Sequence, residues 1–148
     1  MKKIIFILIA SIFLFGCPSD SDFYTRYYSI ENNSNHSLSI RFYINNVLIE
    51  HLSTTFSNNG ERYTGQSSYG DIGIDVFSFP SSAYDSSDSI VIDFDNLKRQ
   101  IYTIDFINQT FSEPIERNIF RHENYEEIGN DRFLFKITED DYNNADDI

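Results

Sequence analysis

The stretch SLSIRFYI, residues 37–44, decides the fold class of this chain of 148 residues, because apolar and polar side chains alternate along it. Successive side chains of a β-strand point to opposite faces, so one face of this stretch carries Leu38, Ile40, Phe42 and Ile44. Asn45 and Asn46 follow, and a short apolar run comes next at residues 47–49. Asparagine tolerates the positive φ that two-residue hairpin turns require. The stretch therefore predicts a strand, a tight turn and a returning strand.

The same alternation recurs along most of the chain. It marks residues 72–76, 89–94, 99–107 and 132–137, and weaker patterns mark residues 27–31 and 62–64. Roughly seven to nine short strands with regularly spaced turn signals are typical of an all-β domain. We therefore expect residues 24–148 to form a single antiparallel β-sandwich domain of the immunoglobulin-like kind. An up-and-down β-barrel is the alternative.

Two stretches depart from the strand pattern. Residues 112–116, SEPIE, have the chemistry of a helix start, and residues 118–127 fit either a helical turn or an irregular strand. Thr138 is followed by three acidic residues, which suits a helix N-terminus. We therefore expect a short C-terminal helix over residues 140–145.

The N-terminus has the form of an export signal. Lys2 and Lys3 precede a dozen mostly apolar residues, 4–15, which are too few for a membrane-spanning helix. The run ends at Gly16 and Cys17, the only cysteine in the chain. The sequence therefore predicts a signal peptide at residues 1–16.

Leu14, Gly16 and Cys17 together resemble the lipobox of bacterial lipoproteins. The resemblance implies that Cys17 is alkylated with diacylglycerol, becomes the first residue of the mature chain and is acylated with palmitate-like chains. Two or three acyl chains anchor a protein stably, whereas one chain binds a membrane only marginally. We expect residues 17–23 to be the lipidated cysteine and an acidic tether.

Ser19, Asp20, Ser21 and Asp22 follow the anchor directly. They resemble the acidic export tag of some Gram-negative lineages, which implies sorting to the outer membrane and exposure at the cell surface. A plain solvated tether, with the domain on the periplasmic face, is the alternative. With its alternating strands, the chain is similar to small uncharacterised β-rich surface lipoproteins of Gram-negative bacteria, a resemblance that implies no activity.

The net charge of the chain limits the classes of partner that it can bind. Without Lys2 and Lys3, 9 basic residues remain against 23 acidic ones, a net charge of −14. Such a surface repels nucleic acid, so we expect no nucleic-acid partner. We expect the chain to contact the membrane through its lipid anchor. An envelope protein or a glycan is the expected partner.

Catalytic and metal-binding patterns are weak. Three scattered histidines, His36, His51 and His122, have no accompanying nucleophile motif, and no closely spaced His or Cys pair suits zinc. We therefore expect no catalytic residues, no metal and no cofactor. The best prediction is a non-enzymatic cell-envelope lipoprotein that binds or scaffolds a partner at the outer membrane.

Acidic and aromatic residues keep further alternatives open. Asp93, Asp95 and Asn96 cluster at a predicted hairpin tip, with Asp71, Asp85 and Asp88 in neighbouring loops. Oxygen ligands in loops suit a calcium- or small-ligand-binding module, and paired carboxylates suit a lipid-anchored hydrolase of glycan or peptide. The run Tyr24, Tyr27 and Tyr28 is either a binding patch or, more simply, part of a first core strand.

Overall fold

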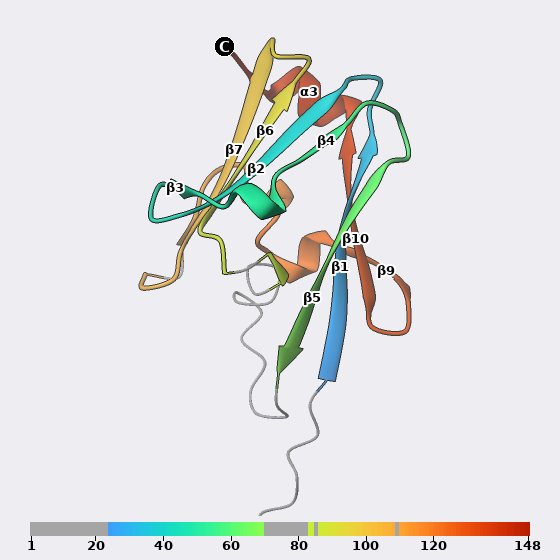
Figure 1. Ribbon diagram of the computed structural model, residues 1–148, viewed down its shortest axis with the longest axis vertical. Coiled ribbons are helices and arrows are strands. Elements are labelled where there is room, and N and C mark those ends of the chain that lie inside the picture. The colour runs from blue at the N-terminus through green and yellow to red at the C-terminus, as the bar shows by residue number, and fades with distance from the viewer. Residues whose placement is uncertain (1–23, 70–82, 85, 109) are drawn as a thin grey trace, which may run out of the picture.

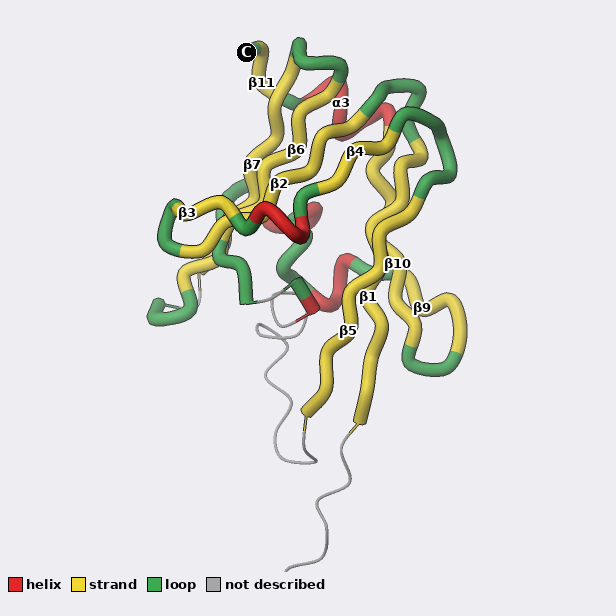
Figure 2. Tube along the Cα trace, viewed as in Figure 1, coloured by secondary structure: helices red, strands yellow, loops and turns green. Residues whose placement is uncertain are grey.

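The computed structural model describes residues 24–69, 83–84, 86–108 and 110–148. The described residues form two facing β-sheets with one short helix at the C-terminal end (Figures 1 and 2). The two sheets stay separate layers, which confirms the predicted sandwich and not the alternative of a closed barrel. None of the helices in this part of the chain is long and apolar enough to cross a membrane.

The larger sheet has seven strands. Five of them run in the order β11-β7-β6-β2-β3, while β4 pairs with β2 and β8 pairs with β7, and every pairing is antiparallel. Their bounds are β2 (Leu38–Ile44), β3 (Val47–Leu48), β4 (Thr54–Phe56), β6 (Ser89–Phe94), β7 (Lys98–Asp105), β8 (Thr110–Phe111) and β11 (Asp146–Asp147).

The smaller sheet has four strands in the order β5-β1-β10-β9. They are β5 (Arg62–Tyr69), β1 (Tyr24–Asn33), β10 (Arg132–Thr138) and β9 (Glu126–Gly129). The first and the last long strands, β1 and β10, run parallel, with Tyr28 opposite Phe133. Among the strands of the described residues, this parallel pair is the one departure from the antiparallel sheets that the sequence predicts.

The predicted hairpin turns are present. Tyr43 pairs with Leu48 across the turn at Asn45 and Asn46, which have φ angles of 50° and 64°. Asp95 and Asn96 take the same left-handed conformation between β6 and β7, with φ angles of 50° and 57°. The left-handed conformation costs Asn and Asp less free energy than it costs most other residues. These short stretches therefore determine where the strands reverse.

The core lies between the two sheets. Leu38, Ile40 and Phe42 point inward as predicted, each no more than 1% exposed. Ile44, which the alternation placed on the same face, is 38% exposed because β2 extends past the opposing sheet into its hairpin. Phe106 lies within the strand predicted at residues 99–107, but β7 ends at Asp105 and Phe106 is 43% exposed.

The irregular stretches are single turns of 3-10 helix. They are η1 (Glu50–Leu52), η2 (Ile115–Arg117) and η3 (His122–Asn124), so the helix start expected at residues 112–116 gives a 3-10 turn only. Residues 118–127 hold both a helical turn and the start of β9. The strand expected at residues 72–76 lies outside the described residues.

The C-terminal helix, α3 (Glu139–Asn144), is present one residue earlier than predicted. Asp141 in its first turn accepts hydrogen bonds from the backbone N–H and the hydroxyl of Thr138, at 2.7 and 2.9 Å. Arg117 donates to the same carboxylate from Nε at 3.0 Å and from Nη2 at 2.6 Å. The ion pair fixes the helix against η2.

Candidate functional site

The outer face of the seven-stranded sheet carries three rows of side chains. Because Leu38, Ile40 and Phe42 point into the core, the residues between them point outward. The pairing registers then place the following side chains side by side: Thr55, Ser39, Asp93, Arg99 and Asp146 in the first row, Arg41, Val91 and Ile101 in the second, and Leu48, Tyr43, Ser89 and Thr103 in the third. We call this surface the outer face.

Two arginines share one aspartate on the outer face. Arg99 donates to Asp93 from Nε at 2.6 Å and from Nη2 at 3.1 Å, and Nη2 of Arg41 donates to the same carboxylate. The side chain of Asp93 is 8% exposed, whereas those of Arg41 and Arg99 are 31% and 36% exposed. The hydrogen bond with Asp93 raises the pKa of Arg99. One nearly buried carboxylate therefore holds two accessible guanidinium groups in place.

An apolar depression lies beside this triad. It encloses about 310 Å³ and is lined by Tyr43, Asn46, Ser89, Val91, Ile101 and Thr103. Ile101 is 45% exposed, and Val91 and Tyr43 are half-buried. Arginine and tyrosine are both enriched where proteins bind other proteins, and Tyr43 lines the depression beside the two arginines.

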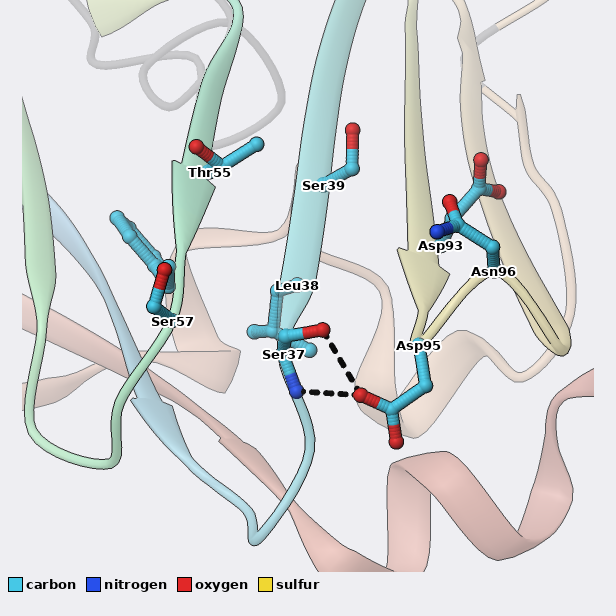
Figure 3. Close-up of a pocket in the computed structure, with 9 residues that line it drawn as sticks. Ser37, Leu38, Ser39, Thr55, Ser57, Asp93, Asp95 and Asn96 are labelled. Atoms are coloured by element: carbon cyan, nitrogen blue, oxygen red, sulfur yellow. Dashed lines mark hydrogen bonds between the residues drawn. The ribbon is translucent and has the colours of Figure 1, made fainter.

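A polar groove of about 360 Å³ adjoins the triad on its other side (Figure 3). Its lining is mostly hydroxyl, carboxylate and amide groups, from Ser37, Ser39, Thr55, Ser57, Asp93, Asp95 and Asn96, with Leu38 and Phe56. The backbone N–H and the hydroxyl of Ser37 both donate to Asp95 at 2.8 Å. The groove is thus bordered by the β6–β7 turn and the start of β2.

His36 lies between Asp95 and Glu139 and contacts both carboxylates. Its Nδ1 lies 2.6 Å from Asp95 and its Nε2 lies 3.1 Å from Glu139 at the start of α3. Burial disfavours the charged imidazole, but the hydrogen bonds to Asp95 and Glu139 outweigh burial and raise the pKa of His36. The bond from His36, with those from Ser37, lowers the pKa of Asp95.

The groove carboxylates do not fit acid–base hydrolysis. Such catalysis needs one carboxyl group that stays protonated near neutral pH, and hence a raised pKa. Asp95 has a lowered pKa because it bonds to His36, and Asp93 is paired with two arginines. Asp95 therefore does not supply the protonated carboxyl group that the hydrolase alternative requires.

The acidic residues proposed as calcium ligands are also engaged by other groups. Asp93, Asp95 and Asn96 do line one groove, as their clustering predicted. However, Asp93 is engaged by two arginines and Asp95 by His36, and Asp88 accepts the N–H of Asn45 at 2.7 Å at the opposite end of the sheet. Asp71 and Asp85 lie outside the described residues. Within the described ranges, no three His, Cys, Asp or Glu side chains converge as a metal site would require.

The N-terminal tyrosines do not form a patch among the described side chains. Tyr28 is fully buried and packs against Phe133 and Tyr125, with centroid distances of 5.4 and 5.2 Å. Tyr27 is half-buried, and Arg132 lies over its ring at 5.0 Å. The side chain of Tyr24 is outside the described set. β1 is thus a core strand, which is the simpler of the two readings.

The outer face of the four-stranded sheet provides a contrast. Two of its cations pair locally, since Arg62 binds Glu31 and Lys136 binds Glu126 at 2.7 Å, and Arg132 lies over the ring of Tyr27. Ser29 and Thr64 share a hydrogen bond of 2.9 Å across the strands. Leu134 points to this face but is only 4% exposed. Most of the polar groups named here therefore contact one another across the strands.

Sequence reasoning missed the shared-aspartate triad and the His36 cluster. Arg41, Asp93 and Arg99 each stand at an outward position of a predicted strand, which was the available signal. The predicted lipidation residue Cys17 and the predicted sorting residues Ser19, Asp20, Ser21 and Asp22 lie outside the described residues. No family model matches the chain, and comparisons with curated proteins and with solved structures find no match.

Proposed function

We propose that the chain is a non-enzymatic cell-envelope lipoprotein that binds a partner protein through the outer face of the seven-stranded sheet. The observation that carries the proposal is the difference between the two outer faces. One presents an apolar depression beside Arg41 and Arg99, which share a single carboxylate. On the other face, Arg62 and Lys136 each pair with a glutamate of their own.

The proposed anchor and the outer face are compatible in space. The start of β1 lies at one end of the molecule, whereas α3 and the β6–β7 turn lie at the other (Figure 1). A ten-residue strand spans about 30 Å at its usual rise of roughly 3.3 Å per residue. A lipid at Cys17, followed by a short tether, would hold the N-terminal end of β1 near the membrane. The triad and the polar groove would then face away from the membrane.

The anchor is tested by labelling cells with a palmitate analogue. We expect the wild-type chain to take up the label, and Cys17→Ser to take up none and to accumulate as precursor. Label that persists in Cys17→Ser contradicts the lipoprotein assignment. Protease treatment of intact cells tests surface exposure, and we expect Asp20→Ala combined with Asp22→Ala to protect the domain while lipidation continues.

The outer face is tested by photo-cross-linking in living cells. A photo-reactive amino acid is placed at position 101, or at position 66 as the control. Ile101 and Gln66 are both exposed strand residues, and they lie on the outer faces of different sheets. We expect a discrete protein adduct from position 101 that disappears with Val91→Glu, and none from position 66. Equal adducts from both positions, or none from position 101, contradict a partner-binding role of this face.

A further inference from the structure

We propose that the segment docked on the outer face is an extended, acidic stretch of the partner protein, with carboxylates that meet Arg41 and Arg99 and aliphatic side chains that cover Val91 and Ile101. The inference rests on the function proposed above and adds the chemistry of the partner. It begins with the hydrogen-bonding capacity of the two arginines.

The two guanidinium groups have donors to spare. Each guanidinium has five N–H donors, but Asp93 accepts one bond from Arg41 and two from Arg99. The Nε of Arg41 is buried without a hydrogen-bond partner among the described residues. A carboxylate that arrives from solvent can accept those remaining donors that reach the surface, which the buried Nε of Arg41 does not, and charge-assisted bonds of this kind are the stronger ones. Because Asp93 already orders both arginine side chains, less side-chain entropy is lost when the partner binds them.

Charge complementarity favours an acidic partner at this position. The mature chain carries a net charge of −14 in this account, so attraction for an acidic segment has to come from a local excess of arginine. Away from the outer face, Arg62, Arg117, Arg121 and Lys136 each have an acidic partner of their own. On the outer face two arginines share one aspartate. Asp146 stands opposite Arg99 at the sheet edge and forms no ion pair with it among the described contacts. Asp146 therefore opposes an acidic partner and offers a separate test of the charge argument.

The spacing of the rows favours an extended segment. Side chains on one face of a strand recur about every 6.6 Å, at twice the rise per residue. Asp93, Val91 and Ser89 follow one another at this spacing along β6. An extended peptide lying along β6 repeats its own side chains at the same interval, so acidic and aliphatic positions can meet the charged and apolar rows in turn.

The apolar row favours a peptide over an anionic glycan. Val91 and Ile101 offer branched aliphatic surface in a depression that is lined partly by Tyr43. Sugar hydroxyls placed directly over Val91 and Ile101 would find no hydrogen-bond partner in those two side chains, which is costly. Aliphatic side chains gain free energy by burial at the same place.

The test measures binding of defined probes to the full-length lipidated chain in detergent micelles. The probes are a fluorescent peptide of alternating Glu and Val, a counterpart with Lys in place of Glu, and a fluorescent oligogalacturonate. We expect the acidic peptide to bind about tenfold more tightly than the basic one, and to weaken as salt is added. Equal affinities, or tighter binding of the oligogalacturonate through Arg99, overturn the inference.

Matched variants locate the binding. We expect Arg99→Gln to weaken the acidic peptide about tenfold, because a charge-assisted contact is lost. Arg132→Gln, on the other sheet, should leave the affinity unchanged, and Asp146→Asn should raise it. Ile101 is exposed, so Ile101→Glu and Ile101→Lys preserve the fold and should lower and raise the affinity respectively. Equal effects of Arg99→Gln and Arg132→Gln overturn the inference.

The outcome is separable from that of the proposed function. Cross-linking at position 101 without acidic-peptide binding means that the face docks a partner of other chemistry, and the inference fails alone. Loss of both results removes the face itself from consideration.

Discussion

The imidazole of His36 lies flat against the phenol ring of Tyr142, with ring centroids 3.5 Å apart and ring planes 15° apart. The contact joins the β1–β2 loop to α3, and the hydrogen bonds of His36 to Asp95 and Glu139 extend it to the β6–β7 turn. Lys98 lies over the Tyr142 ring as well, with its Nζ 5.1 Å from the ring centroid. One histidine thus connects three separate segments at the end of the sandwich that bears the polar groove.

We predict that this cluster makes stability depend on pH. The pKa of His36 is raised above its ordinary value of 6.5, so its contribution is complete below pH 6.5 and is lost as the pH rises through the folded-state pKa. The pKa values of Asp95 and Glu139 are lowered from 3.8 and 4.5, so their contribution is lost as the pH falls below those values. The free energy of unfolding should therefore be highest between these limits.

The measurement is urea denaturation of the wild type and of His36→Gln across the pH range. The difference between the two proteins isolates His36, because His122 is present in both. Burial and Arg26 lower the pKa of His122, which gives a dependence of opposite sign. We expect the stability difference to shrink as the pH rises above 6.5. A difference that is constant or grows over that range contradicts the assigned protonation.

Gly65 is required by a close approach of the chain. A Cβ atom at this position would lie 2.1 Å from the carbonyl oxygen of Ala83, so backbone must move to admit any side chain. Forcing extra volume into a packed site costs about 1–3 kcal/mol. We expect Gly65→Ala to lower the free energy of unfolding by an amount in this range, which urea denaturation detects as a lower midpoint. Gln66→Ala, an exposed neighbour in the same strand, is the control and should change the midpoint little; equal effects would mean that the site yields freely.

Asn32 connects two loops from a fully buried position. Its amide nitrogen donates to the carbonyl oxygens of His36 and Asn58, at 2.8 and 3.3 Å, and its amide oxygen accepts from Ser34. Each buried polar group left without a partner costs about 1–3 kcal/mol. Asn32→Ala should therefore lower the thermal midpoint more than replacement of an exposed residue does. Asn32→Asp keeps the acceptor and removes the donor, and midpoints of both variants equal to that of the wild type would rule out this role.

The ion pair of Arg117 and Asp141 should couple α3 to η2 energetically. Asp141 is 8% exposed and accepts from both Arg117 and Thr138. The Arg117 side chain is 38% exposed, so solvent screens the pair and the coupling should be about 1 kcal/mol. A double-mutant cycle with Arg117→Gln and Asp141→Asn, followed by denaturation, measures it. Additive effects of the two substitutions would show that the pair does not hold the helix.

Much of the fold could be predicted because the sequence repeats one local pattern. Alternation over residues 37–44 and 89–94, with Asn45 and Asn46 between two runs, specifies strands and a turn without knowledge of distant contacts. The errors at Ile44 and Phe106 fall at strand ends, where the opposing sheet no longer covers the inward face. The parallel pairing of β1 with β10 depends on contacts across the whole chain, which alternation does not encode.

The candidate site was hidden for the same reason. Arg41 and Asp93 are 52 positions apart, and only the register of β2 against β6 brings them together. The pattern predicted that Arg41 points outward, but it did not predict which charge stands beside it. His36 looked like a plain loop residue, because its partners Asp95 and Glu139 lie on β6–β7 and α3.

The central claim is that the domain stands outside the cell with the outer face of its seven-stranded sheet covered by a partner. Since Cys17 is the only native cysteine and is consumed by lipid in this account, a single introduced cysteine can be labelled selectively. Labelling rates with a membrane-impermeant maleimide are compared for Ile101→Cys and Gln66→Cys, on intact cells and on the purified full-length chain. We predict that Gln66→Cys reacts equally fast in both settings, whereas Ile101→Cys reacts several-fold more slowly on cells. An unchanged ratio of the two rates, or no labelling of Gln66→Cys on intact cells, would contradict the account.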